Sequence, residues 1–388
     1  MEITTYPPIY VPPHDPLQQT VNRLHGELLG MFQVRQTSSN VNGQVITFNG
    51  QWLYDTEAGF SEVERRFQAH GYTTLVRRDK GQDIIIAVEG VVEKAKTGNP
   101  LLNLLLLLLT IITTLAAGSG LAGKSLVSAL MNGSLTAIIA SALAGLPFAL
   151  ALLSILGVHE LGHYVAARAH GVVATLPYFI PMPFGGLGTL GAFISLKSPL
   201  KNRKVLFDIG LAGPVAGFLV AMPLLLAGLW LSQPVPSFMP GLTLRNAGSS
   251  LLVDWMVSVF YPLPAGRTLA MHPIFFAAWF GLLITGINLL PIGQLDGGHI
   301  AYALFGRRAH SLALVTFVLL LIAGTFLSYN WYVWAFFVLL GGLRHPAPLN
   351  NVTPLDPKRK LVGWLSILLF FLIIIPTPFS TPSLPFLR

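Results

Sequence analysis

The 388-residue sequence contains no cysteine and few charged residues. Without cysteine the chain can form neither a disulfide nor a thiolate metal site, so any metal ion must be held by histidine, aspartate or glutamate. Charged residues make up 10% of the chain and hydrophobic residues 53%, whereas soluble domains contain about 25% charged residues. This composition favours a protein that is largely embedded in a membrane.

Acidic residues are almost missing from the later three quarters of the chain. Beyond residue 97 there are five, Glu160, Asp208, Asp254, Asp296 and Asp356. The other eleven of the sixteen precede it: Glu2, Asp15, Glu27, Asp55, Glu57, Glu62, Glu64, Asp79, Asp83, Glu89 and Glu93. This shift predicts a soluble domain over residues 1–96, followed by a polytopic membrane domain.

The net charge of +8 does not indicate a nucleic-acid partner. Basic residues beyond residue 97 stand beside apolar segments, as membrane topology requires, so we expect the lipid bilayer as a partner and no nucleic acid. Residues 1–16 are rich in proline and lack an apolar core, so no secretory signal is expected there.

Residues 1–96 predict a small α+β domain. Helices are expected at residues 16–32, with Asp15 as N-cap, and 61–71, with Ser61 as N-cap and Gly71 as terminator. Strands are expected at residues 45–54, 72–76 and 83–88, the last two joined by a turn at 79–81. Because the domain shows no cluster of catalytic residue types, we expect a regulatory or adaptor role.

Seven apolar segments predict a polytopic α-helical membrane protein with six to eight spans. The shortest of them, residues 331–343, is also compatible with half of a helical hairpin. The segments cover residues 100–117, 135–168, 209–231, 272–290, 311–327, 331–343 and 361–375.

Basic residues predict the orientation of these spans. With residues 1–96 on the cytoplasmic side, the opposite face receives four lysines and arginines, as the positive-inside rule expects. The cytoplasmic face receives eleven: Arg168, Lys197, Lys201, Arg203, Lys204, Arg307, Arg308, Arg344, Lys358, Arg359 and Lys360. In a chloroplast the corresponding side would be the stroma.

The pentapeptide His159-Glu160-Leu161-Gly162-His163 lies near the end of the second apolar segment. On a helix its two histidines are one turn apart on the same face and can share a zinc ion, while Glu160 can act as a general base. The alternative is a pair of core histidines that hold no metal. Ionisable side chains are costly inside a membrane unless they have partners, which favours the metal site.

A zinc site needs a third protein ligand, and few acidic residues can supply it. Asp254 falls on the opposite face, Asp356 in a proline-rich loop, and Asp208 where a cap or salt bridge is expected. Asp296 follows a span that runs in the same direction as the second one, so both motifs reach the same depth. Pro291 before it and two glycines after it predict unwound backbone, which persists at membrane depth only inside protein or beside a wet cavity. A turn aspartate without a ligand role is the alternative.

Together, His159-Glu160-Leu161-Gly162-His163 and Asn288-x-x-Pro291-x-x-x-Leu295-Asp296-Gly297-Gly298 resemble the paired signature of the site-2 proteases, peptidase family M50. The resemblance covers roughly residues 135–310. It implies an intramembrane zinc metalloprotease that cuts membrane-spanning protein substrates, with one Zn²⁺ held by His159, His163 and Asp296. It further implies Glu160 as general base, and Asn288 in contact with the substrate backbone or the oxyanion.

The resemblance divides the chain into residues 1–96, a protease core at 97–310, and accessory spans at 311–388. Many members carry a PDZ domain in a loop between spans, but the loops at residues 171–207 and 232–271 are too short to contain one. In lacking a PDZ domain the chain resembles the cyanobacterial and chloroplast branch of the family. Ala212-Gly213-Pro214 matches a small-residue element of the family, whereas Gly217 stands where many members have asparagine. The glycine-rich residues 184–196, with a strand at 192–196, are expected to form a membrane-dipping hairpin that pairs with substrate, or else a plain connector.

Three other histidines have weaker signals. His299 is a candidate hydrogen-bond partner of Asp296, whereas His170 and His272 are expected to be loop or interface residues.

Two other functions remain open: a zinc-binding scaffold that holds client helices without cutting them, and a metal transporter. A protease class with glutamate as third ligand is disfavoured, because no glutamate follows Glu160 in this chain.

Overall fold

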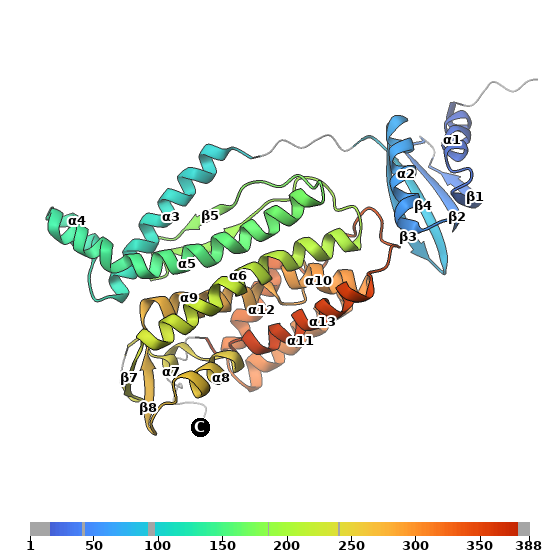
Figure 1. The fold of residues 1–388 in the computed structure, drawn as a ribbon. Coiled ribbons are helices and arrows are strands. Elements are labelled where there is room, and N and C mark those ends of the chain that lie inside the picture. The colour runs from blue at the N-terminus through green and yellow to red at the C-terminus, as the bar shows by residue number, and fades with distance from the viewer. Residues whose placement is uncertain (1–15, 41–42, 92–97, 185, 240, 379–388) are drawn as a thin grey trace, which may run out of the picture. The chain divides into compact units, whose positions relative to one another are not determined.

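The computed structural model describes residues 16–40, 43–91, 98–184, 186–239 and 241–378 (Figure 1). The chain forms two compact units, each described by itself below. The N-terminal unit comprises Met1–Glu93 and the distant segment Leu349–Thr353; the membrane unit comprises Lys94–Pro348 and Pro354–Arg388. The predicted boundary at residues 96 and 97 lies outside the described residues, and the one at residue 310 falls within a helix.

The N-terminal unit is a four-stranded antiparallel sheet with two helices. Its core is formed where alternate residues of the strands, such as Phe48 and Ile85, are buried against Phe67 of the second helix. The strand order is β1-β2-β4-β3. Its elements are α1 Pro16–Glu27, β1 Phe32–Ser39, β2 Val45–Trp52, α2 Thr56–Ala69, β3 Tyr72–Asp79 and β4 Gln82–Glu89.

Two predicted helix boundaries in this unit are wrong. The first helix ends at Glu27, and the unpredicted strand β1 begins at Phe32. The second helix begins at Thr56, because the carboxylate of Asp55 caps it by accepting bonds from the Glu57 and Ala58 N–H groups. Ser61 therefore lies inside the helix and is not its cap. The predicted cap Asp15 falls outside the described residues.

The other predictions for this unit are confirmed in outline. Gly71 follows the last turn of α2 with a φ of +82°, a left-handed conformation typical of a helix terminator. Strand β2 covers most of the predicted strand 45–54, and β3 and β4 contain the predicted strands 72–76 and 83–88. The turn between β3 and β4 is formed by Lys80 and Gly81, both with positive φ.

The membrane unit is mainly helical, and each of the seven predicted apolar segments contains a helix. Four described helices, α3, α5, α6 and α11, are long and apolar enough to cross a membrane, which marks the chain as an integral membrane protein. Six to eight spans remain a prediction. The elements are α3 Pro100–Leu121, α4 Leu126–Met131, α5 Leu135–Ala169, β5 Tyr178–Pro181, β6 Thr189–Phe193, α6 Arg203–Leu231, β7 Gln233–Pro236, α7 Leu244–Ala247, α8 Leu251–Phe260, β8 Arg267–Ala270, α9 Pro273–Asn288, α10 Asp296–Phe305, α11 Arg308–Phe326, α12 Asn330–Gly341 and α13 Pro357–Ile373.

Helices α5, α6 and α9 pack side by side at the centre of this unit (Figure 1). Large side chains such as Phe148, Phe207 and Trp279 are fully buried among them. The first loop between these helices forms the antiparallel hairpin β5–β6, and the second forms α7, α8 and the pair β7–β8. The described residues of both loops therefore contain no PDZ-sized domain.

The cap of α2 provides a test of local stability. Replacing Asp55 with alanine leaves the Glu57 and Ala58 N–H groups without their acceptor, and should destabilise α2 by about 1 kcal/mol. The matched control is Ser61→Ala, which removes only a hydroxyl that bonds the Glu57 carbonyl. Hydrogen exchange of α2 amides in the full-length protein should rise for Asp55→Ala and hardly change for the control. If both variants raised the exchange rate equally, Asp55 would not be the cap of α2.

Candidate metal centre

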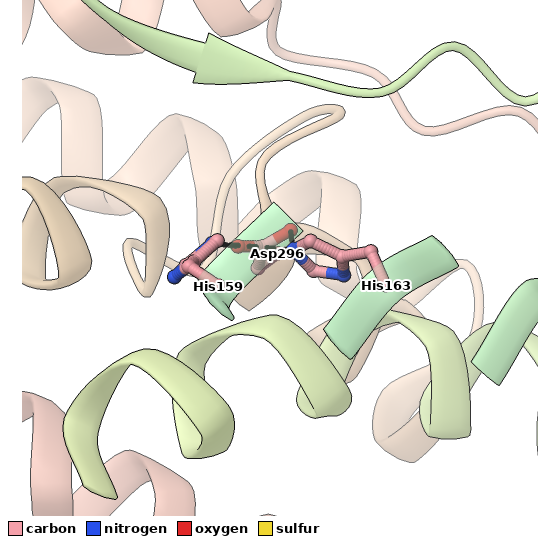
Figure 2. Close-up of side chains that lie close together, drawn as sticks. All are labelled: His159, His163 and Asp296. Carbon is pink, nitrogen blue, oxygen red and sulfur yellow. Dashed lines mark hydrogen bonds and ion pairs between the residues drawn. The ribbon is translucent and has the colours of Figure 1, made fainter. Parts of the chain in front are cut away.

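Three side chains from distant parts of the sequence converge in the membrane unit. His159 and His163 come from α5, and Asp296 is the first residue of α10 (Figure 2). The two histidines are buried, and the Asp296 side chain is 14% exposed. The structure therefore brings together the three residues predicted as ligands.

Both imidazoles, those of His159 and His163, present their Nε2 atoms to the carboxylate of Asp296. His163 Nδ1 lies 2.7 Å from the carbonyl oxygen of Ile209 in α6. Since a carbonyl can only accept, Nδ1 carries the proton and Nε2 keeps its lone pair for a metal. Figure 2 shows the rings of His159 and His163 on either side of Asp296, with dashed lines to its carboxylate.

The position of Asp296 depends on the break between α9 and α10. Helix α9 ends at Asn288, and the chain runs through irregular backbone before α10 begins at Asp296. A Cβ on Gly297 would lie 2.0 Å from the carbonyl oxygen of Leu289, so only glycine allows the chain to fold back this closely. The predicted unwound backbone is confirmed, and it places Asp296 opposite the histidines.

The donor set fits a zinc ion. His159 Nε2 and His163 Nε2 lie 3.2 Å apart, and each is 3.2 Å from an oxygen of Asp296. Ligands bound tetrahedrally to zinc at 2.0–2.1 Å are separated by about 3.3 Å, a spacing that the two nitrogens already have. The Asp296 carboxylate offers Oδ2 to His159 and Oδ1 to His163, and one ligand atom from each of the three residues lies within 4.8 Å of the others. A zinc ion held by these three residues would keep a further coordination position for water or substrate, as catalytic zinc sites do.

The three residues line a cavity of about 210 Å³. Glu160 also lines it and is buried within hydrogen-bond reach of the Ile194 backbone. Asn288 lines it too, with its Nδ2 3.5 Å from His159 Nε2. Ile194 belongs to the segment predicted as a substrate-pairing hairpin and also lines the cavity. Sequence reasoning missed Gln294, whose only signal is its place near Asp296, and Ile209 at the start of the third apolar segment.

The weaker candidates have structural partners. His170 caps the end of α5 and lies 2.9 Å from Asp208, which also pairs with Arg359. The salt bridge expected at Asp208 is therefore present. His272 caps the start of α9 by accepting a bond from the Ile274 N–H. The His299 ring lines the cavity, but its hydrogen bond goes to His345 and not to Asp296.

Small residues of α6 let the histidine-bearing helix approach closely. A Cβ on Gly213 would lie 2.0 Å from His163 Nε2, and one on Gly217 would lie 3.1 Å from His159 Nδ1. The Ala212-Gly213-Pro214 element thus leaves room for the two imidazoles. Gly217 likewise serves the packing here.

Gly213→Ala should therefore expel His163 from its position. We expect the purified variant to hold well below one zinc per chain, because a methyl group would occupy the place of the imidazole. Gly157→Ala is the matched control on α5, since its Cβ would meet only Phe179 at an ordinary 3.7 Å. Metal content by elemental analysis decides the point, and full zinc loading of Gly213→Ala would contradict this packing.

Comparison with known proteins agrees with this geometry. Residues 147–326 match the model of peptidase family M50. The chain is 34% identical over 255 residues to the probable zinc metalloprotease EGY2, chloroplastic, of Arabidopsis thaliana, a match that covers 61% of this chain and 42% of that protein. It is 35% identical over 247 residues to the probable zinc metalloprotease EGY1, chloroplastic, of the same plant, which covers 60% and 43%.

The chain is also 32% identical over 260 residues to the probable zinc metalloprotease EGY3, chloroplastic, of Oryza sativa subsp. indica, a match that covers 62% of this chain and 44% of that protein. The chain spans less than half the length of these relatives. No solved structure matches it significantly. The matched region contains both histidines, the aspartate and the helices that place them. The chain is therefore similar to peptidase family M50 over the region that carries the candidate metal centre.

Proposed function

We propose that this protein is an intramembrane zinc metalloprotease that hydrolyses a peptide bond within or near a transmembrane segment of its substrates. One observation carries the proposal. Two imidazole nitrogens 3.2 Å apart and the carboxylate of Asp296, with one oxygen 3.2 Å from each nitrogen, share a buried cavity with a glutamate, in a unit of long apolar helices. The chloroplast relatives are named probable zinc metalloproteases, which supports the zinc-dependent proteolysis in this proposal.

Glu160 is the general base in this proposal. Zinc bound by His159, His163 and Asp296 would supply Lewis acidity, which acidifies a water molecule and polarises the scissile carbonyl. The Glu160 carboxylate lies in the same cavity and accepts the proton of the attacking water. The same carboxyl group then delivers the proton to the leaving amine, so that peptide hydrolysis leaves Glu160 unchanged.

Asn288 is placed to bind the substrate. It is the last residue of α9 and lies in the cavity wall, with its Nδ2 3.5 Å from His159 Nε2. An amide N–H in this position can stabilise the negative charge that develops on the carbonyl oxygen, or hold the substrate backbone.

The hairpin β5–β6 is the proposed docking edge for the unwound substrate. Strand β6 pairs with β5, and Ala192, Phe193 and Ile194 at its end line the metal cavity. A substrate helix must unwind before its peptide bond can be attacked, and strand addition replaces the hydrogen bonds that it loses. Among the described residues, β6 has only β5 as a strand partner, which leaves its other edge for this purpose.

The membrane arrangement completes the proposal. The chain crosses the bilayer six to eight times. The N-terminal unit lies on the cytoplasmic or stromal side, and the active site is closer to that side of the membrane than to the other. The basic residues on that side support this orientation. The division into a core at residues 97–310 and accessory spans at 311–388 belongs to the same proposal.

The general base is tested by Glu160→Gln. Purified protein in lipid vesicles should cleave a membrane-embedded reporter, and the variant should lose at least about 10²-fold in kcat because it cannot accept the proton. Zinc content should stay at wild-type level, since Glu160 is not a ligand. A variant that cleaves as fast as wild type with its zinc in place would refute the mechanism.

Asn288→Ala separates substrate binding from metal binding. We expect a loss of about 10²-fold in kcat, the usual effect of removing one donor to a developing oxyanion, with unchanged zinc content. Asn246→Ala is the control, because this asparagine lies in the short helix α7, outside the cavity. Loss of zinc from Asn288→Ala, or no loss of rate, would remove this role.

Two other functions remain as outcomes of the same experiments. A scaffold without proteolysis would bind client helices in vesicles but release no product in the wild type. A metal transporter would move zinc into vesicles without a protein substrate. The glutamate beside the metal favours proteolysis over both, because neither scaffold nor carrier needs a general base.

A further inference from the structure

A second cavity, of about 470 Å³, lies in the membrane unit against the break between α9 and α10. Its other walls come from α10, α11, α12 and α13. The lining is apolar except for Thr316 and Ser366, and the Ser366 hydroxyl is already bonded to the Gly363 carbonyl. This cavity shares no lining residue with the metal cavity, so it is a separate site with an apolar interior.

The cavity is long and narrow. On α13 its lining residues recur at helical spacing from Trp364 through Phe371 to Ile374, which spans about 15 Å along a helix. Spread over this length, a volume of about 470 Å³ has a mean width of about 6 Å, whereas a helix with its side chains is about 10 Å wide. The shape therefore suits a fatty acyl chain and not another helix.

The cavity is open on a side that lipid covers in a membrane. Leu319, Trp364 and Phe371 line it, and each of these residues remains more than half exposed. Leu319 belongs to α11, which is long and apolar enough to cross a bilayer. An acyl chain of the surrounding bilayer can therefore enter between α11 and α13 without passing through water.

Each of these two helices carries a basic residue near its start, in line with the cavity. Arg308, the first residue of α11, stands four residues before Leu312 and eight before Thr316, both of which line the cavity. Lys360 stands four residues before Trp364 on α13. Because residues four apart share one face of a helix, both basic residues lie on the faces that enclose the cavity.

The two basic residues flank the same end of the cavity. Phe305, the last residue of α10, lines the cavity, and its ring centre lies 5.7 Å from that of Trp364. Arg308 follows Phe305 by three residues, and Lys360 precedes Trp364 by one helical turn. The contact between the two rings therefore brings the starts of α11 and α13 together.

Neither basic side chain is neutralised within the part of the chain that the structure describes. Arg308 and Lys360 are exposed and form no ion pair there. Asp356, one turn before Lys360, is held by Arg359, whose backbone N–H and guanidinium lower the pKa of this carboxyl to about 2. Arg359 also binds Asp208 of α6. The two charges are thus left for an anion from outside the chain.

We propose that this cavity binds one anionic phospholipid of the membrane, with an acyl chain inside and the phosphate at Arg308 and Lys360. The apolar lining selects the chain, and the two unneutralised charges select a headgroup with net negative charge over a zwitterionic one. The lipid enters sideways from the bilayer, and its headgroup stays at the level where α11 and α13 begin.

The bound chain packs against the backbone that places Asp296. The cavity wall on that side is the break and the first turn of α10, formed by Leu289, Leu290, Pro291 and Gly297. Because a ligand stabilises the conformation that it binds, the lipid holds these turns in place. The site steadies the metal centre from outside it, and neither zinc nor proteolysis is needed for the lipid to bind.

The first experiment separates the two aligned charges from the general charge of this face. Arg308→Gln/Lys360→Gln should bind phosphatidylglycerol about 30-fold more weakly, because each basic side chain beside a headgroup contributes about fivefold. The matched control, Arg307→Gln/Lys358→Gln, removes the same charge from exposed neighbours and should bind like wild type. Delipidated full-length protein is titrated with the lipid, and bound lipid is counted by native mass spectrometry. Phosphatidylcholine should bind the wild type at least about tenfold more weakly.

The second experiment fills the cavity. Thr316→Trp places an indole among its lining residues, and should lower phosphatidylglycerol binding at least about tenfold because the chain loses its place. Val318→Trp is the matched control, since Val318 lies on the same helix, is exposed and does not line the cavity. Glycerol phosphate, which is the headgroup without its chains, should not displace the lipid. The exposed charge variants test the site even where Thr316→Trp disturbs the packing of α11.

The third experiment measures the effect on the break. In the wild type, phosphatidylglycerol should slow hydrogen exchange of the Leu290 and Ile292 amides several-fold; these amides bond the carbonyls of Ile287 and Leu290. At the same lipid concentration Arg308→Gln/Lys360→Gln should show little slowing, because the site is mostly empty.

Four results would overturn the inference. Equal loss of lipid in both double charge variants would leave only a generally basic face, and equal binding of the two phospholipids would remove the headgroup site. Wild-type binding in Thr316→Trp would place the lipid outside the cavity. A dimer that lipid disperses would identify a second copy of the chain as the occupant. Unchanged exchange at Leu290 and Ile292 with lipid bound would remove the effect on the break.

Discussion

The arrangement of the membrane unit follows from one constraint: ionisable side chains that are buried among apolar helices, here His159, His163 and Asp296, must have partners. Two imidazoles and a carboxylate in this environment are costly alone, and they are stabilised by one another, by the Ile209 carbonyl that binds His163, and by a metal when one is bound. Around them every approach is tight: glycines on α6 make room for the rings, and the backbone folds back at Gly297 to place the aspartate. The site is thus a packing arrangement as much as a set of ligands.

Sequence reasoning could predict the residues that converge at the candidate metal centre because their signals are local or scarce. His159 and His163 are one helical turn apart, and Asp296 could be chosen because only five acidic residues follow residue 97. The long apolar helices were equally clear, since length and hydropathy alone decide them. The cap of α2 was misplaced because Asp55 and Ser61 both suit a helix start, and only the burial of Phe60 against the sheet selects the earlier one.

The missed features are those with no local signal. Strand β1 has the sequence Phe-Gln-Val-Arg-Gln-Thr-Ser-Ser, whose later half has no apolar alternation, and it forms because β2 offers it an edge. His345 looks like an isolated histidine until the fold places it against His299. The pairing of Leu349–Thr353 with β3 joins residues far apart in sequence, so no window of the chain can show it.

That pairing sets an order for the making of the protein. During synthesis the strands of the N-terminal unit emerge first, but the segment that covers β3 emerges only after α11 and α12 have been made. Until then β3 presents open backbone groups, the kind of edge that invites pairing with other chains. Completion of the first unit therefore waits for nearly the last helix, and a ribosome that stops earlier releases a domain with an unprotected edge.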